Sequence, residues 1–458
     1  MRRFSTFLSL RAIPPRGLVK LNRKLLEIKG PDSAKFLNGL LTTKMLPTFE
    51  KKNLTTISAS DLQALENSKM LGLTDEQMQT ENWGILHEDE TYDPDVPERL
   101  GIRRDGRYSM LLNSKGRVLS DLFVYPTPYT PNNGPKYLLE MAPKNFGQIQ
   151  MMLKLHKLRA KIDISVANYN SWFYYDHSEE FDEFYDLLQS EYLNNRNSKS
   201  VEAASTWSKY LQDRLVNEEI LTEADASQLQ GFAIDDRAPC FGLKFVLPPE
   251  SQLQNLEDIK VGHEVYDTLR TLVGISEISD FKSETLPFEN NLDYMNGINY
   301  NKGCYVGQEL TIRTFHSGVI RKRVMPIQLF RVGEPVSEEL KLADEDLGLG
   351  QYTDLQLINT SKKNQDAEPQ SSNPFGSKMR RDKKVGEIIR VQNNIGLAVV
   401  YVAEISRDNA PGNNEFPIVS RSSSEVAGKF IAKVHIPEWW PLEELEEEEE
   451  EEEKEHDD

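Results

Sequence analysis

The alternation of hydrophobic and polar positions predicts both strands and helices in the first part of the chain. Residues 18–29 alternate as in β structure, and residues 34–41 then place apolar side chains at helical spacing. Two further alternating runs, 108–112 and 118–125, flank the turn-forming sequence Asn-Ser-Lys-Gly and predict a β-hairpin. Residues 18–125 are therefore predicted to contain both helices and strands.

The middle of the chain continues this mixture. A strand over 137–141, a helix over 145–158 and a strand over 161–166 give the order typical of split β-α-β subdomains in an α+β fold. Residues 178–230 have helical spacing and many acids, and residues 263–274 fit another helix.

The last third of the chain, residues 318–440, has short alternating segments that predict β-strands. Its expected strands cover residues 319–332, 385–392, 395–402 and 426–435.

Two polar segments interrupt the pattern of helices and strands along the chain. Residues 48–101 form a predicted excursion, and the Lys- and Ser-rich residues 359–384 form a predicted disordered loop. Residues 441–458 are predicted to be a disordered acidic tail.

Charge and composition exclude several classes of protein. The 458 residues carry a formal charge of −19, and residues 443–458 hold 13 acids and one lysine, a net −12 that leaves −7 elsewhere. Binding to nucleic acid needs a basic stripe, so no nucleic-acid partner is expected. We find no run of 18 apolar residues and therefore expect no transmembrane helix.

The first twenty residues resemble a mitochondrial presequence. They contain arginines and serines among apolar side chains, and the first acid of the chain is Glu27. Residues 1–20 are therefore predicted to direct the protein to the mitochondrial matrix, with cleavage between Ala12 and Lys20.

The candidate chemistry centres on one cysteine. Cys240 and Cys304 are the only cysteines, which excludes a disulfide framework and a protein-only zinc site. Cys240 is interpreted as structural. Cys304 lies in the sequence Lys-Gly-Cys-Tyr-Val-Gly-Gln-Glu, and residues 308–314 after it could open a helix or continue a strand. If they form a helix, its N-terminus and Lys302 would favour the reactive thiolate. A buried, inert thiol is the alternative.

This block resembles the fingerprint of the YgfZ family, folate-binding relatives of the glycine-cleavage T-protein that assist iron–sulfur cluster assembly. The preceding run Leu-Pro-Phe-Glu-Asn-Asn-Leu-Asp (286–293) and the following Arg313 also fit the family, and a weaker likeness extends over residues 20–440. The resemblance implies a T-protein-like folate-binding module over residues 21–317 and a C-terminal barrel. It implies tetrahydrofolate as a cofactor.

The resemblance also suggests site residues. Cys304 and Lys302 would carry the chemistry, and folate-facing positions would be Asp121, Glu289, Tyr305, Gln308, Glu309 and Arg313. T-proteins have two adjacent aspartates where this chain has Ser120 and Asp121, and this difference argues against aminomethyl transfer. Asp121 could equally be an edge-strand carboxylate, and Glu289 could equally cap backbone groups. Arg237 is expected in a surface ion pair rather than on a folate carboxylate.

Two functions therefore compete. The first is a matrix assembly factor for [4Fe–4S] proteins such as aconitase and lipoate synthase. A cluster usually has four protein ligands, so Cys304 would share a transient cluster with a partner, and the resemblance implies mitochondrial A-type scaffold proteins. The second is a tetrahydrofolate-dependent one-carbon transferase. A third reading is that the motif only shapes a loop, with Glu309 and Arg313 at ion-pair spacing.

Overall fold

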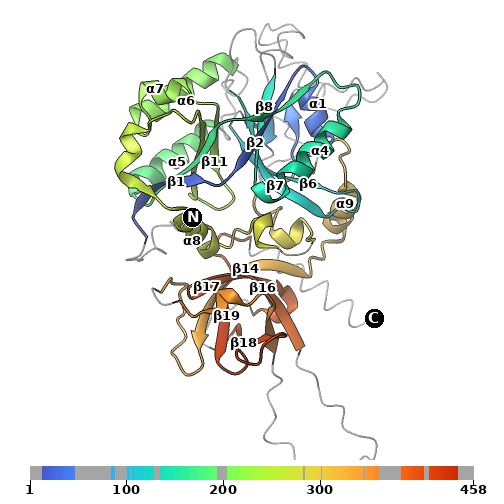
Figure 1. Ribbon diagram of the computed structural model, residues 1–458, viewed down its shortest axis with the longest axis vertical. Coiled ribbons are helices and arrows are strands. Elements are labelled where there is room, and N and C mark those ends of the chain that lie inside the picture. The colour runs from blue at the N-terminus through green and yellow to red at the C-terminus, as the bar shows by residue number, and fades with distance from the viewer. Residues whose placement is uncertain are drawn as a thin grey trace, which may run out of the picture. The chain divides into compact units, whose positions relative to one another are not determined.

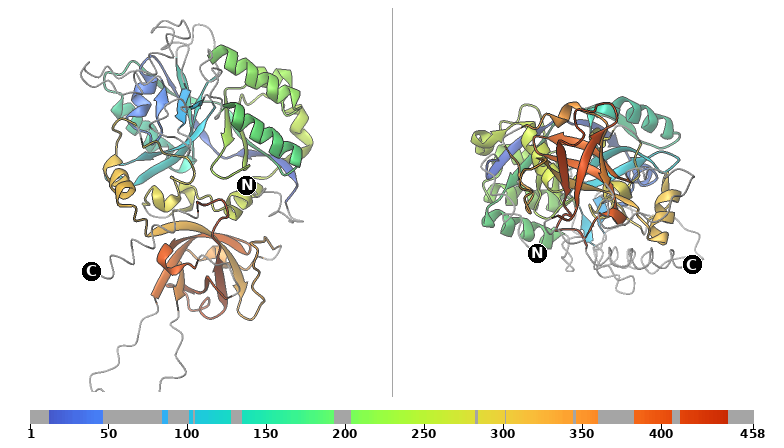
Figure 2. Two further views of the ribbon diagram at one scale, coloured as in Figure 1. Left: turned by 180° about the vertical axis from the view of Figure 1, so that it is seen from behind. Right: turned by 90° about the horizontal axis from the view of Figure 1, so that it is seen from below.

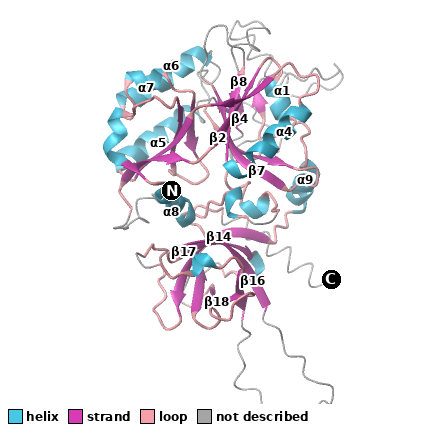
Figure 3. Ribbon diagram, in the orientation of Figure 1, coloured by secondary structure: helices cyan, strands magenta, loops and turns pink. Residues whose placement is uncertain are grey.

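The protein's structure is a computed structural model, and the residues that it describes are 13–46, 84–87, 101–103, 105–127, 135–192, 204–281, 284–300, 302–343, 346–359, 383–406 and 412–441. The chain forms two compact units (Figure 1). The first unit comprises Met1–Asp267 and Glu277–Gly318, and the second comprises Thr268–Ser276 and Val319–Asp458. Helices and strands are both present in the first unit, as Figure 3 shows, which confirms the predicted α+β class.

One five-stranded sheet of the first unit is accompanied by three helices. Its strands lie in the order β11 (Gly231–Asp235), β12 (Gly242–Leu247), β10 (Asn170–Asp176), β1 (Arg16–Leu21) and β13 (Lys260–Val261). Neighbours are antiparallel except β1 and β13. Helices α5 (Glu179–Tyr192), α6 (Ala204–Asn217) and α7 (Glu223–Ser227) lie together beside it (Figure 1). Their buried side chains, including Tyr185 and Leu215, form one core with Phe245.

A second five-stranded sheet is antiparallel throughout. Its order is β6 (Arg107–Leu112), β7 (Val118–Pro126), β8 (Lys136–Met141), β2 (Lys24–Lys29) and β9 (Asp163–Ala167). Helices α1 (Ser33–Asn38) and α4 (Phe146–His156) share its core through Leu37, Ile149 and Leu153. A small third sheet contains β3 (Met45–Leu46), β4 (Gly84–His87) and β5 (Gly101–Arg103).

The stretch 18–29, predicted as β structure, divides between the two large sheets. β1 pairs with β10 and β13, whereas β2 pairs with β8 and β9. Only Asn22 and Arg23 separate the two strands, so the chain passes directly from one sheet to the other. Arg23 is therefore placed where the sheets adjoin, which matters for the site.

Short helices complete both units. The longer ones are α8 (His263–Leu272) and α9 (Gln308–Ser317). Single 3₁₀ turns are η3 (Pro143–Asn145), η5 (Gln254–Ile259), η6 (Ile278–Asp280), η7 (Phe288–Asn290), η8 (Leu349–Gln351) and η9 (Val402–Glu404).

The second unit contains the predicted β-barrel, which is confirmed as a closed sheet. Its order is β14 (Lys322–Arg331), β17 (Ile395–Tyr401), β16 (Lys383–Gln392), β15 (Leu355–Asn359), β18 (Glu415–Ser420) and β19 (Phe430–Val434) (Figure 2). Closure pairs the strand edges that an open sheet would expose. β15 and β18 were not predicted, and they are needed to close the barrel.

The predicted leader, residues 1–20, overlaps β1 and the buried Ile13. Its boundary stays a prediction. The rest of the predicted leader lies outside the described residues. So do the excursion 48–101 apart from β4 and Gly101, the loop 359–384 apart from its ends in β15 and β16, and the tail after Pro441. No helix in the described parts of the chain has the length and apolar character to cross a bilayer.

Candidate functional site

Cys304 is exposed in a loop that leads into helix α9. The helix begins at Gln308, after Gly307 as its N-cap residue with φ of 83°. This left-handed conformation favours glycine. The stretch after the motif, which the sequence left open between helix and strand, is therefore a helix, and the thiol precedes it.

Gly307 also lies against the turn between β6 and β7. A Cβ atom at Gly307 would come within 2.4 Å of the Asn113 carbonyl oxygen and 3.2 Å of the Gly116 Cα. Gly116 is crowded in return, because its own Cβ would lie 2.9 Å from the Gly307 oxygen. Backbone atoms cannot move aside as a flexible side chain can, so the turn and the loop fix each other's position.

Lys302 fixes the other end of the loop. Its Nζ donates to the carbonyl oxygens of Asn38 and Thr43, each at 3.0 Å, and to that of Leu41. Burial, and to a lesser extent Lys44, lower the pKa of Lys302 to about 7. Three carbonyl acceptors oppose this shift, because they favour the ammonium form. The described contacts of Lys302 thus give it a role in holding the loop.

The residues after the cysteine continue this anchoring. Val306 N donates to Gly39 O at 3.1 Å, and Tyr305 N donates to Gln308 Oε1 at 3.0 Å. Tyr305 is buried, and the Lys302 Nζ lies 4.5 Å from its ring centroid. Burial raises the pKa of Tyr305. The motif therefore presents an exposed thiol on a backbone held at several points.

Helix α9 displays apolar and charged side chains near this loop. Glu309 and Arg313 are both exposed. Ile312 and Phe315 are exposed by 42% and 48%, and the Phe315 ring stacks on Tyr300 with centroids 3.8 Å apart. Tyr300 and Phe315 were not among the predicted site residues, although an exposed aromatic residue on a largely polar helix could have indicated them.

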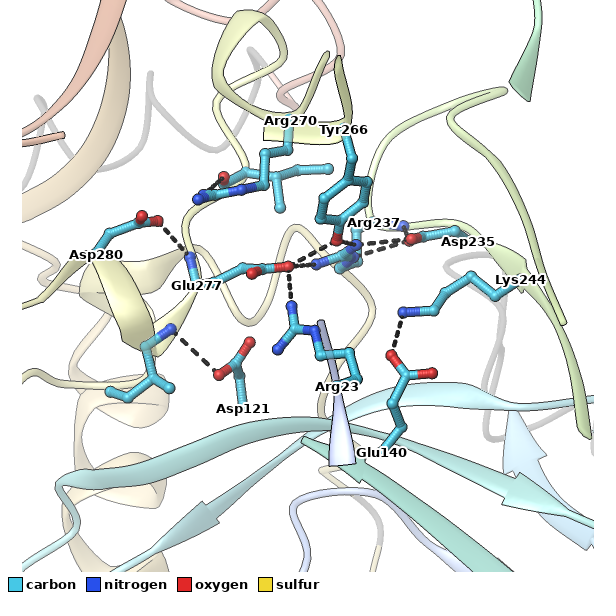
Figure 4. Close-up of polar contacts among 12 residues, drawn as sticks. Arg23, Asp121, Glu140, Asp235, Arg237, Lys244, Tyr266, Arg270, Glu277 and Asp280 are labelled. Carbon is cyan, nitrogen blue, oxygen red and sulfur yellow. Dashed lines mark hydrogen bonds and ion pairs between the residues drawn. The ribbon is translucent and has the colours of Figure 1, made fainter. Parts of the chain in front are cut away.

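A buried charge cluster lies elsewhere in the first unit (Figure 4). Arg237 forms a bidentate pair with Asp235, with Nε–Oδ1 at 2.8 Å and Nη2–Oδ2 at 2.7 Å. Glu277 Oε1 accepts from Tyr266 OH at 2.6 Å, forms an ion pair with Arg23, and lies 3.5 Å from Arg237 Nη1. Each charge therefore has a partner, as buried ions require.

The predicted surface position of Arg237 is wrong. Its side chain is 1% exposed, and its guanidinium also donates to Tyr266 OH at 2.8 Å. Local sequence suggests an exposed arginine, but Tyr266 and Glu277 approach it from distant parts of the chain. Arg237 is consequently a structural centre of the cluster.

Asp121 belongs to the same buried region. β7 is an interior strand, so the edge-strand reading of Asp121 is wrong. Its Oδ1 accepts from Ile278 N at 3.2 Å. Burial raises the pKa of Asp121 against the opposing charge of Arg23, and Glu277 adds to the rise. Ser120 donates its hydroxyl to the Asp121 backbone oxygen at 2.8 Å.

Tyr108 is the unusual member of this region. Its side chain is 1% exposed, and among the described residues its hydroxyl has no hydrogen-bond partner. The Arg237 guanidinium lies 5.3 Å from its ring centroid. Burial, then the Asp121 charge, raise the pKa of Tyr108 well above its ordinary value. Buried hydroxyls normally find a partner, so this one requires an explanation.

A further buried pair lies between the two sheets. Glu140 accepts from Lys244 Nζ at 2.6 Å and from Tyr125 OH at 2.7 Å. Burial alone would raise the pKa of Glu140, but Lys244 and then Arg23 hold it below its ordinary value. The carboxylate is therefore satisfied by contacts within the protein.

Glu289 is engaged by its own turn. Its Oε2 accepts from Leu286 N at 3.3 Å and from the Thr285 hydroxyl at 3.4 Å. These contacts match the capping interpretation. The folate-facing role suggested for Glu289 remains a prediction.

Cys240 is less accessible than Cys304. It is partly buried and packs against the core of the first sheet. Burial, with Asp182 and Asp186, raises the pKa of Cys240 to about 12. Within the described ranges, no group of three or more His, Cys, Asp or Glu side chains could hold a metal ion. Cys304, the exposed thiol, stays a predicted metal ligand.

Several known proteins are similar to this chain. Residues 321–442 match the model of the CAF17 C-terminal beta-barrel domain. The mitochondrial iron–sulfur cluster assembly factor IBA57 homolog of Debaryomyces hansenii is 35% identical over 94% of this chain and 100% of its own length. The homolog of Meyerozyma guilliermondii is 36% identical over 93% and 99%.

Two more distant similarities are to a yeast protein and to a solved structure. The IBA57 protein of Saccharomyces cerevisiae is 29% identical over 84% of this chain and 81% of its own. Among solved structures, aminomethyltransferase T of the glycine cleavage system from Bartonella henselae aligns with a TM-score of 0.49 and 11% identity. That alignment covers 93% of this chain and 87% of the other.

Proposed function

Because the chain belongs to the family of mitochondrial IBA57 iron–sulfur cluster assembly factors, we propose that it helps mature [4Fe–4S] proteins in the matrix, with Cys304 as a cluster ligand. Iron–sulfur assembly in mitochondria follows from that membership. The cysteine, the partner and the client proteins are the proposed part.

The observation that carries the proposal is an exposed thiol on an anchored loop. Lys302 and Val306 hold the loop against residues 38–43, and Cys304 stays accessible. The thiol loses its proton when Sγ binds iron. A fixed loop lowers the entropic cost of meeting a partner.

The number of thiols implies a shared cluster. A cluster usually takes four protein ligands, and Cys240 is partly buried in another core. The remaining ligands would come from a partner, for which we propose a mitochondrial A-type scaffold protein. The cluster is then cargo passed through a complex, and aconitase and lipoate synthase are the proposed recipients.

The experiment replaces Cys304 with Ala in cells that lack the endogenous protein. We expect matrix aconitase activity to fall to the level of the null cells, while a [2Fe–2S] enzyme keeps its activity. Cys240→Ala, at matched abundance, is the control and should support normal aconitase. Normal aconitase in the Cys304→Ala cells would reject Cys304 as the ligand.

We also propose tetrahydrofolate as a ligand of the first unit. The Tyr108 hydroxyl is buried without a partner among the described residues and lies in the region of Asp121. A reduced folate supplies ring N–H and amino groups that hydrogen-bond to such oxygens. Tyr108 and Asp121 would bind and orient it. Absence of a thermal shift with tetrahydrofolate would contradict this assignment.

One-carbon transfer is not part of the proposal. The hydroxyl of Ser120, at the position where T-proteins carry a second aspartate, is used in a hydrogen bond to the Asp121 backbone. A serine cannot replace a carboxylate as a base. Formation of a folate-dependent transfer product by the purified protein would overturn this view.

A further inference from the structure

Helix α4 and the turn after it form a basic segment in an acidic protein. No acid occurs between Glu140 and Asp163, although the chain carries a net charge of −19. The cations of the interval are Lys144, Lys154, Lys157, Arg159 and Lys161. Lys154, Arg159 and Lys161 are exposed at the helix end. This concentration of positive charge is local to one element.

The same element exposes large aliphatic side chains. Met151 and Leu155 are each 65% exposed and Leu158 is 88% exposed. The side chains that attach the helix to its sheet are on the other face and are buried: Phe146, Ile149 and Leu153. Packing within the described part of the protein therefore does not explain why Met151, Leu155 and Leu158 are aliphatic. We call these three residues, together with Lys154, Arg159 and Lys161, the α4 face.

Leu158 has an unfavourable backbone conformation. It has φ of 42° and follows Lys157, the C-cap residue of the helix. Glycine usually occupies this position, because a side chain there is strained. A leucine that is strained and almost fully exposed contributes little to the fold. Strain of this kind is often retained for function.

We propose that the α4 face binds the surface of an anionic lipid membrane. Exposed aliphatic chains flanked by lysine and arginine are typical of helices that lie in the membrane interface. The aliphatic groups would enter the acyl boundary, and the long cationic side chains would reach the headgroups. The protein would bind peripherally, without spanning the bilayer.

A lipid surface fits better than an acidic protein. Protein interfaces are centred on aromatic and arginine side chains that fill pockets. The apolar members of the α4 face are instead two leucines and a methionine, and they protrude. One acid borders the face, since Asp32 Oδ2 accepts from Lys161 N at 2.6 Å.

The net charge of the chain does not prevent such binding. Residues 443–458 contribute −12 of the −19. Salt screens exposed charges beyond about 8 Å at physiological ionic strength, so the local cations determine the attraction at contact. Binding should therefore weaken as salt is added.

The test is cosedimentation of the full chain with vesicles of phosphatidylcholine and phosphatidylserine, compared with vesicles of phosphatidylcholine alone. We expect binding only to the anionic vesicles. Leu155→Gln with Leu158→Gln should reduce it by roughly tenfold or more, because two exposed leucines no longer enter the bilayer. Val332→Gln, which changes an exposed valine in the barrel unit, should leave it unchanged.

Charge is tested with a matched pair of double variants. Lys154→Gln with Arg159→Gln should also weaken binding by roughly tenfold. Arg421→Gln with Lys429→Gln removes the same net charge from exposed positions elsewhere and should have no such effect. An equal loss in both double variants would overturn the role of the α4 face.

Leu158→Gly separates membrane binding from folding. It should raise the melting temperature, since glycine adopts the left-handed conformation without strain, and still weaken vesicle binding. Unchanged vesicle binding of this variant, or equal binding to both vesicle types, would overturn the proposal. Failure to bind any vesicle while retaining binding to immobilised polyglutamate would assign the face to an acidic polypeptide and overturn it too.

Discussion

The buried hydroxyl of Tyr108 is exceptional in its cluster. Its neighbours in the cluster, Arg237, Glu277 and Tyr266, all have partners, whereas the Tyr108 oxygen has none among the described residues. A buried hydroxyl without a partner costs about 1–3 kcal/mol. Tyr108 therefore reduces the stability of the ligand-free protein.

Tyr108→Phe should raise the free energy of unfolding of the ligand-free protein by about 1 kcal/mol, because it removes an unsatisfied group. It should also reduce the rise in melting temperature that tetrahydrofolate causes. Tyr175→Phe is the matched control: Tyr175 is likewise buried and its hydroxyl is unpaired in the described chain. A full folate shift in Tyr108→Phe would exclude Tyr108 from the folate site.

Some features of the Cys304 loop could be predicted from the sequence and others could not. The Cys304 motif could be singled out from its own residues, but the sequence left the stretch after it open between helix and strand. The partners of Lys302 could not be predicted, because Asn38, Leu41 and Thr43 are distant in sequence and offer only backbone carbonyls. No side-chain pattern can indicate such contacts.

Among the elements, the Cys304 loop is held by three kinds of contact. Lys302 binds carbonyls, Gly307 lies against the β6–β7 turn, and Gln308 binds the Tyr305 amide. The ammonium presents three donors in a tetrahedral arrangement, whereas a guanidinium is planar. An arginine, although it keeps the positive charge, should therefore not substitute for Lys302.

Lys302→Met and Lys302→Arg should both make the Cys304 loop more mobile, although neither variant changes the cysteine itself. We expect faster hydrogen exchange at the Tyr305 and Val306 amides in both variants, and a loss of stability of about 2 kcal/mol. Lys115→Met, at an exposed position in the neighbouring turn, is the control and should leave exchange unchanged. Wild-type exchange in Lys302→Arg would mean that positive charge alone suffices.

Elements were predicted best where the period was strong and local. Helix α4, the β6–β7 hairpin and β14, β16 and β17 were anticipated closely. β11 and β12, which are buried along their whole length, were not predicted. β6 is buried in the same way, but the turn-forming sequence between it and β7 identified the hairpin. The division of residues 18–29 between two sheets is set by distant strands, so local alternation cannot show it.

For the whole molecule, buried histidines should make the fold sensitive to acid: His177 in the first unit and His435 in the barrel unit both have a pKa lowered to about 4, chiefly by burial. In the barrel unit, His435 is buried, and its pKa is lowered to about 4 by burial and by Lys433. An unfolded histidine titrates near 6.5. Between these values the unfolded chain binds a proton that the native barrel excludes, so stability falls as pH falls.

The barrel should therefore lose up to about 3 kcal/mol of stability as pH falls from 6.5 to 4, with the full contribution present above 6.5. Denaturant titrations across this range measure the loss. His435→Gln cannot take up the proton and should show a flatter profile by that amount. An identical pH dependence in the variant would show that other groups dominate the acid response.

The arrangement of β1 also bears on how the protein acquires its fold. A chain that is synthesised, or drawn through an import channel, from its N-terminus delivers Leu18 and Val19 first. Their partners in β10 and β13, such as Phe173 and Lys260, follow only after most of the first unit has emerged. Until then an apolar strand has no edge to pair with, and such segments aggregate readily. Entry into the organelle should thus be the stage at which this protein depends most on chaperones.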